Sequence, residues 1–144
     1  MNFARIAAAA VTAWIVSLPV GFVVSDVVLA DLYRANTAAL RPDADMLAVL
    51  PLGFGFLLIG FFAFAYAYAK GYEGGNGIME GIRFGVLVAV LVTSFGLIWQ
   101  YILFPITGAL SVALIIDSIV EMAIYGGIVG AIYKPLPVAQ RVTV

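Results

Sequence analysis

The chain has 144 residues, of which 65% are hydrophobic and only 10% charged, with a formal net charge of −1 and neither cysteine nor histidine. A soluble domain carries about 45–50% apolar and about 25% charged residues, so this chain has too few polar groups to cover its apolar surface in water. Its charge argues against nucleic-acid binding, and the missing thiols and imidazoles exclude disulfides and make haem, zinc or other cofactor sites unexpected.

Four stretches are long and apolar enough to cross a bilayer, which takes about 20 residues as an α-helix. They cover residues 6–29, 46–69, 82–104 and 109–133, and a tail follows at 134–144. None alternates polar and apolar residues over its length as a half-buried strand would. The sequence therefore predicts an all-α integral membrane protein, a four-helix bundle in a single transmembrane domain over residues 1–144.

The first span also has features of a secretory signal, because Arg5 precedes the apolar run and residues 28–30 resemble a cleavage site. A signal has an apolar region of about 7–15 residues, and the run at residues 6–29 is longer. We therefore interpret it as a membrane-spanning helix that carries Asp26 near its outer end.

Lysine and arginine are distributed unevenly between the two sides of the predicted bundle. With four spans, the N-terminus, the loop after the second span and the C-terminal tail share one side. That side carries Arg5, Lys70, Arg83, Lys134 and Arg141, and the other side carries Arg34 and Arg41. Because short cytoplasmic loops are rich in these residues, we expect both termini in the cytoplasm and a place in the inner membrane of a bacterium.

The loop at residues 71–77 is rich in glycine but lacks the Gly-x4-Gly-Lys-Ser/Thr pattern of a phosphate-binding loop. Nucleotide binding is therefore not expected. Glu80 and Arg83 follow this loop, and their spacing of three residues favours a surface ion pair on a helix.

Glycines recur at intervals of four residues in the third and fourth spans. They are Gly77, Gly81 and Gly85 around the start of the third span, and Gly126 and Gly130 in the fourth. Small residues at this spacing let helix backbones approach closely within a membrane. The pattern predicts helix packing but fits contacts within one chain as well as contacts between chains.

Two carboxylates in the fourth span are the sharpest indication of function. Asp117 and Glu121 are four residues apart and share a helix face, about 12 and 18 Å below the outer end at about 1.5 Å per residue. A charged carboxylate at that depth is costly unless it is protonated or paired, and no Lys or Arg occurs between residues 84 and 133.

Three interpretations of this pair stay open: hydrogen bonding in the protonated form, a wet path that binds a proton or cation, or pairing with a basic residue of another protein. The hydroxyl groups considered for hydrogen bonding are those of Thr93, Ser94, Ser118 and Tyr125.

Asp26 and Gln100 lie near the outer ends of the first and third spans. Together with Asp117 they would form a polar pocket that opens outward. The simpler interpretation is that both reach the headgroup layer, where polar groups cost little.

The motifs YAKGYEGG at residues 68–75, EGIRFG at 80–85, and VEM, GGIVG and YK between residues 120 and 134 suggest a relationship. In these motifs the chain resembles the small uncharacterised four-span membrane proteins of bacteria, a domain of unknown function. The resemblance implies a four-span fold and implies no activity.

The lack of a soluble domain, a catalytic set and cofactor ligands favours an accessory transmembrane subunit without catalysis of its own. Its partners would be membrane lipids and other transmembrane subunits, or further copies of itself. The alternative is a small oligomeric transporter or channel that uses Asp117 and Glu121. A lipid-modifying enzyme is less favoured, because only these two acids could hold a metal.

Overall fold

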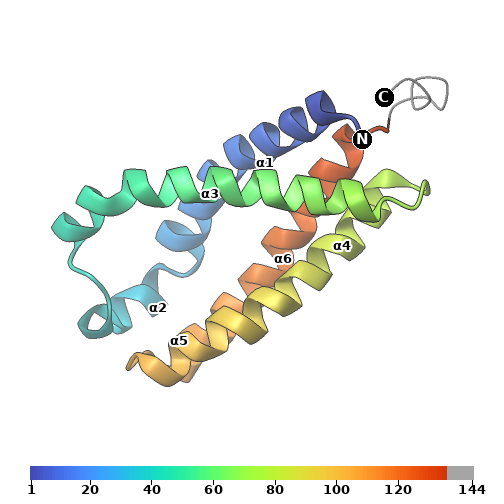
Figure 1. Cartoon of the computed structure of the whole chain (residues 1–144). Helices are drawn as coiled ribbons and strands as arrows, with labels where there is room; N and C mark the ends of the chain where they lie inside the picture. Colours follow the sequence, from blue (N-terminus) through green and yellow to red (C-terminus); the bar gives the residue numbers. More distant parts are fainter. Residues whose placement is uncertain (136–144) are drawn as a thin grey trace.

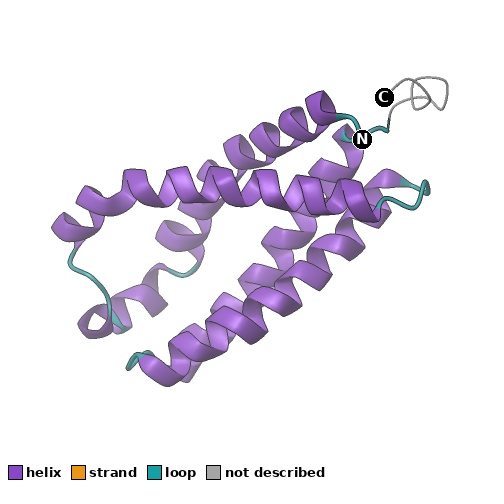
Figure 2. Cartoon of the chain, in the orientation of Figure 1, coloured by secondary structure: helices purple, strands orange, loops and turns teal. Residues whose placement is uncertain are grey.

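The computed structural model describes residues 1–135, except for the side chain of Asp43, and within that range every regular element is a helix (Figure 2). Four helical stretches are long and apolar enough to cross a membrane, namely Phe3–Val28, Ala44–Gly71, Gly77–Leu103 and Gly108–Ile132. The predicted all-α class with four apolar helices is therefore confirmed. The predicted tail lies outside the described residues from residue 136 onward.

The first span consists of α1 (Phe3–Val23) and a π-helical turn, η1 (Val24–Val28). The side chain of Asn2 accepts a hydrogen bond from the Arg5 N–H and so caps the start of α1. A short helix, α2 (Ala30–Ala35), and a single 3-10 turn, η2 (Thr37–Ala39), follow in the first loop.

The second span is α3 (Asp43–Gly71), and the third consists of α4 (Gly77–Val92), the π-helical turn η3 (Thr93–Leu97) and α5 (Ile98–Leu103). The fourth span is α6 (Gly108–Ile132), which Thr107 caps by accepting a hydrogen bond from the Leu110 N–H. Neither π-helical turn was expected from the sequence.

The third helix begins at Gly77 rather than at residue 82, because Asn76 caps it by accepting hydrogen bonds from the next residues' N–H groups. The expected ion pair between Glu80 and Arg83 is wrong: no such pair occurs in residues 1–135. The Glu80 carboxylate instead accepts hydrogen bonds from the backbone N–H groups of Glu73 and Gly75, which holds the α3–α4 loop against the helix.

The four spans leave the bundle open along one side (Figure 1). α4 and α6 pack against each other along most of α4, and α1 packs against both α3 and α6, whereas α3 makes little contact with α6. The N-terminus, the α3–α4 loop and the last turn of α6 lie at one end, called the loop end here. α2 and the α5–α6 turn lie at the other, called the α2 end.

The buried core lies toward the loop end and is built from three helices. Its members are Ile6, Ala9, Ala10, Ala13, Phe61, Ala65, Tyr68, Ala69, Tyr125, Val129 and Tyr133. The alanines of α1 let the larger rings of α3 and α6 approach. Phe61 and Tyr125 meet edge to face with their ring centroids 5.1 Å apart, and the Tyr68 hydroxyl donates to the Gly77 carbonyl at 3.1 Å. These contacts fix α3 to the rest of the bundle at the loop end.

The other half of α3, residues 44–60, lacks such contacts and is called the free half here. Within it only Leu58 is partly buried, and every other residue is exposed. One side-chain hydrogen bond, from the Trp14 ring N–H to the Phe54 carbonyl at 3.1 Å, ties it to α1. Toward the α2 end, α3 and α4 diverge (Figure 1).

Candidate functional site

The five predicted packing glycines meet at one interface within the chain, between α4 and α6. A Cβ atom added at Gly77 or Gly81 would collide with the backbone carbonyl of Gly130 or Gly126, respectively. One added at Gly85 would collide with the carbonyl of Met122. Only glycine allows backbones this close, so the spacing in the sequence corresponds to an intramolecular contact.

This interface fixes the rotation of α6 and therefore the direction of its polar side chains. Asp117 and Glu121 are both half-buried. They lie two turns and one turn before Tyr125, on the side of α6 from which Tyr125 meets Phe61 of α3. The acids therefore continue the α3-facing side of α6 beyond the last core contact, where α3 has begun to diverge.

Three polar side-chain atoms of the third and fourth spans are buried without a hydrogen-bond partner in the part of the chain that the structure describes. Glu121 Oε1, Ser118 Oγ and Thr93 Oγ1 have no hydrogen-bond partner among the described residues. Thr93 and Ser118 therefore do not supply the hydrogen bonds that the sequence suggested as one way to accommodate Glu121. The Tyr125 phenol lies beside the Glu121 carboxylate. Buried polar groups without partners are rare in native proteins and call for an explanation.

Tyr33 of α2 is half-buried at the α2 end of the bundle, near the acids. Burial raises the pKa of its phenol, and the negative charges of Asp117 and then Glu121 raise this pKa further. A charge effect of this kind requires proximity, so Tyr33 lies close to both carboxylates although it belongs to a loop helix. The sequence did not predict that Tyr33 lies near the acids, because an isolated tyrosine in a polar loop is typical of the membrane interface.

Asn36 and Thr107 hold α2 in this position. Asn36 is buried, its side-chain amide donates to the Thr107 hydroxyl at 3.1 Å, and its amide oxygen accepts from the Thr107 N–H at 2.7 Å. The same amide donates to the Leu32 carbonyl at 2.7 Å. These bonds connect the first loop to the α5–α6 turn. Neither residue was predicted from the sequence, although a threonine before an apolar helix is a recognisable N-cap.

The other two predicted polar residues do not join the acids. Asp26 is exposed and accepts a hydrogen bond from the neighbouring Ser25 hydroxyl at 3.1 Å. Gln100 is exposed on α5. Within residues 1–135 no hydrogen bond or ion pair links either of them to Asp117, so these three side chains are not gathered into one polar cluster.

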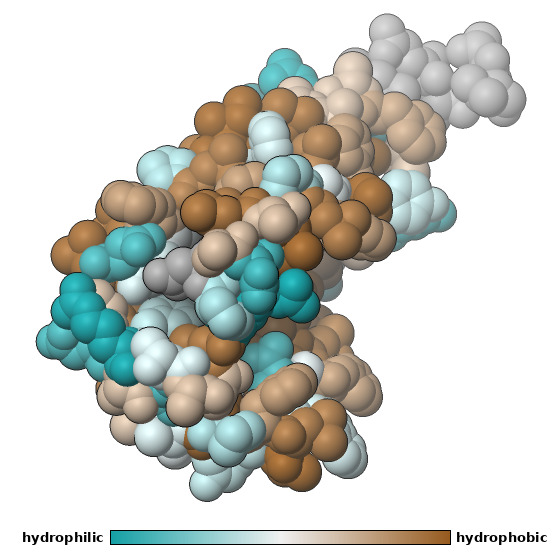
Figure 3. Space-filling model, turned by 90° about the vertical axis from the view of Figure 1, so that its left-hand side faces the viewer, coloured by the Kyte–Doolittle hydropathy of each residue, from teal (hydrophilic) through white to brown (hydrophobic). Residues whose placement is uncertain are grey.

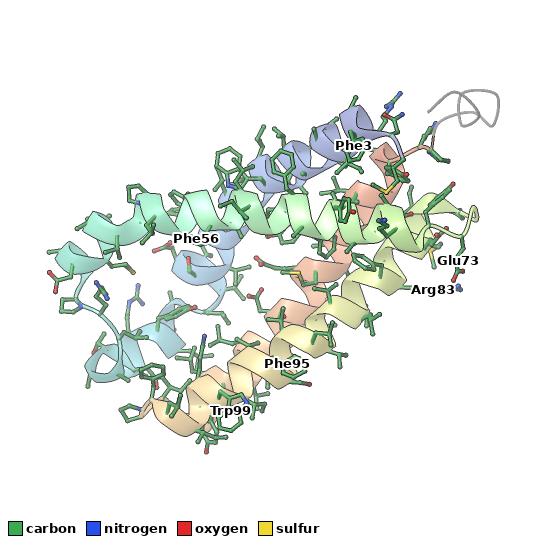
Figure 4. All side chains as sticks on the ribbon, in the orientation of Figure 1. Phe3, Phe56, Glu73, Arg83, Phe95 and Trp99 are labelled. Carbon is green, nitrogen blue, oxygen red and sulfur yellow. The ribbon has the colours of Figure 1, made fainter. Side chains whose placement is uncertain are left out.

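Two surface hollows, of about 400 and 550 Å³, flank the α3–α4 loop, and neither is lined by the four predicted polar residues. Figure 4 places Glu73 and Arg83 at this loop and Phe56 far along α3. Among the described residues there is no group of three acidic side chains that could hold a metal ion. The acid pair thus lies away from both hollows.

The chain matches no model of a protein family, no curated protein and no solved structure. Membership of a bacterial four-span family therefore stays a prediction.

Proposed function

We propose that this chain is an accessory transmembrane subunit that packs against a larger membrane protein complex and has no catalytic activity of its own. One observation supports this above the others. In the most apolar stretch of each span, 28% and 22% of residues are buried in the first and fourth spans, but only 6% in the second and third. The most apolar stretches of the second and third spans are therefore covered least by the rest of the chain.

The glycines of α3 support the same proposal. A Cβ added at Gly53, Gly55 or Gly60 would meet nothing within 4 Å, whereas a Cβ added at the packing glycines of α4 and α6 would collide with the backbone of the other helix. Helices in lipid associate by close backbone contact and side-chain packing, since lipid tails give no hydrophobic force between them. Open glycines in the exposed half of α3 therefore suit contact with a helix from another chain.

The proposal includes a location. Five Lys or Arg residues lie on the side of both termini and two on the other, which favours termini in the cytoplasm. The bacterial inner membrane is the setting we propose, in keeping with the resemblance to bacterial four-span proteins.

Native mass spectrometry of the protein, extracted gently from its own membranes, tests this function. We expect a fixed stoichiometry with at least one other membrane protein. Phe54→Ala, in the free half of α3, should weaken the association, whereas Phe3→Ala should not. Phe3 is the matched control because it is 68% exposed and lies at the start of α1, in the span that the rest of the chain covers most. Recovery of the parent protein only alone or only as a homo-oligomer would contradict the proposal.

A small oligomeric transporter or channel is the second candidate. It is favoured by Glu121, whose Oε1 atom is buried without a hydrogen-bond partner near the middle of α6, because ionisable groups at this depth often mark ion or proton paths. Proton or cation flux into vesicles, lost on Glu121→Gln, would support it. Equal flux with the parent and variant proteins would remove Glu121 from such a path.

A further inference from the structure

We infer that the acid pair binds a transmembrane helix of another chain that carries a lysine or arginine, and that this helix lies between α6 and the free half of α3. The inference deepens the proposed function by naming the chemistry of the partner.

The two helices separate beyond the contact of Phe61 with Tyr125. On α3 the face that follows Phe61 consists of Leu57, Phe54 and Leu50, which are 38%, 40% and 38% exposed. On the opposite side of α3, Phe56 is 66% exposed. The first face is thus turned toward the bundle and yet remains substantially uncovered, so a further helix has room to lie against it.

The α6 side of this space is acidic. Asp117 and Glu121 project there, and no Lys or Arg occurs in residues 42–69 of α3 or residues 84–133 of the third and fourth spans. The only ion pair in residues 1–135 joins Arg34 to Asp31, in α2. Two carboxylates in a membrane interior are stabilised by a cationic partner. Lysine and arginine supply this charge together with several N–H donors.

A second observation, independent of the two charges, is an uncharged group beside them. The Ser118 hydroxyl follows Asp117 directly, in a residue only 9% exposed, and has no hydrogen-bond partner among residues 1–135. A lysine ammonium has three N–H donors and an arginine guanidinium has five. Either group could bond several oxygen atoms at once, which a purely apolar helix could not do.

The cover formed by α2 favours a helix as the occupant over a soluble peptide. Asn36 ties α2 to Thr107 at the start of α6, and the half-buried Tyr33 of α2 lies within range of the charges of Asp117 and Glu121. Figure 3, which faces this end, shows hydrophilic residues gathered between apolar surfaces above and below. Entry is therefore sideways, through the membrane, between α3 and α6.

The test uses the full chain reconstituted in phosphatidylcholine vesicles with synthetic transmembrane peptides of about 20 residues. The peptides are Leu/Ala helices with a central Lys, Leu or Glu. Binding is measured as energy transfer from a donor fluorophore on the Thr37→Cys variant to an acceptor on the peptide. The introduced thiol is unique because the chain has no cysteine. We expect the Lys peptide to bind at least about tenfold more tightly than the Leu peptide, a difference easily resolved in a titration, and the Glu peptide to bind no better than the Leu peptide.

Two kinds of variant distinguish the effect of the acidic charges from the effect of the space beside α3. Asp117→Asn with Glu121→Gln should abolish the preference for the Lys peptide, and helical content measured by circular dichroism checks that this variant folds. Leu57→Trp keeps both acids but fills the space, so it should also weaken Lys-peptide binding. Phe56→Trp, on the opposite face of α3, and Glu73→Gln, in the α3–α4 loop, should not.

Equal binding of the Lys and Leu peptides would overturn the inference, as would a Lys preference that persists in the double variant. These results are distinguishable from failure of the proposed function. A fixed complex in native mass spectrometry without a preference for the Lys peptide would support the accessory role and reject the inference that the partner helix is basic. The absence of any complex removes the accessory role even if the Lys peptide binds.

Discussion

Gly81 lies at the close contact between α4 and α6, and a methyl group there would collide with the Gly126 carbonyl. The carbonyl belongs to the α6 backbone and the backbone of α4 fixes the position of the methyl carbon, so no side chain can move aside to relieve the collision. We expect Gly81→Ala to separate the two helices and to lower the free energy of unfolding by about 1–3 kcal/mol, as overpacking of a close contact does.

Gly55→Ala is the matched control, because a Cβ there meets nothing within 4 Å and alanine favours a helix over glycine by about 0.5–1 kcal/mol. Unfolding of both variants in a mixed-micelle SDS titration, followed by circular dichroism, measures the difference. A Gly81→Ala variant as stable as the parent would show that the α4–α6 contact is looser than these positions imply.

The single residues differ in how visible their roles were in the sequence. Glycine spacing and acids within an apolar run are local patterns, so both drew attention to the correct helix faces. Tyr33 and Asn36 act through contacts with residues far along the chain, and their loop has no periodic pattern. The expected pair of Glu80 with Arg83 was wrong because two backbone N–H groups of the loop compete for the same carboxylate.

Among the elements, α2 depends on one side chain more than its length suggests. A helix of six residues is too short to be stable alone, and the buried amide of Asn36 connects it to Thr107 and Leu32 through three hydrogen bonds. We expect Asn36→Ala to release α2, with faster hydrogen–deuterium exchange in residues 29–40 and a local loss of about 1–3 kcal/mol.

Asn76→Ala supplies the comparison, because Asn76 caps α4 at the loop end. It should increase exchange around the α3–α4 loop and leave residues 29–40 unchanged. If Asn36→Ala left exchange in α2 unaltered, the position of Tyr33 above the acids would have to be maintained by other contacts.

The number and approximate limits of the long helices could be predicted from the sequence, because the length of an apolar run follows from the thickness of the bilayer. The divergence of α3 could not. In a membrane both the lipid-facing and the protein-facing sides of a helix are apolar, so hydropathy does not show which side packs. Both halves of α3 are predominantly apolar, so composition alone does not show that only the half with Phe61 and Tyr68 joins the core.

At the scale of the whole molecule, α4 and α6 form a tight pair. α1 packs against α6, and α3 packs mainly against α1. The pair is held by backbone contacts, whereas α3 is held mainly at the loop end. This unequal packing places the acids at the boundary between a closed core and an open side. An intact bundle in which all four helices packed equally would have enclosed Asp117 and Glu121 among apolar side chains, at a high cost in free energy.

The arrangement of the ends leads to a prediction about orientation. The N-terminus, the α3–α4 loop and the last turn of α6 lie at the same end (Figure 1), as an even number of crossings requires, and most of the basic residues lie there too. Basic residues are retained in the cytoplasm during insertion. We therefore expect Thr37→Cys, at the α2 end, to react with a membrane-impermeant maleimide in intact cells, and Glu73→Cys to react only after the membrane is opened.

Both positions are exposed in the structure, so a difference in their labelling reports the side of the membrane rather than burial. Opposite labelling would place α2, Tyr33 and the lateral opening on the cytoplasmic half. The acid pair would remain within the membrane, because its depth along α6 does not depend on direction, but a basic residue in the partner helix would then have to lie in the cytoplasmic half of its own span. Orientation thus decides where along a candidate partner the pairing lysine or arginine should be sought.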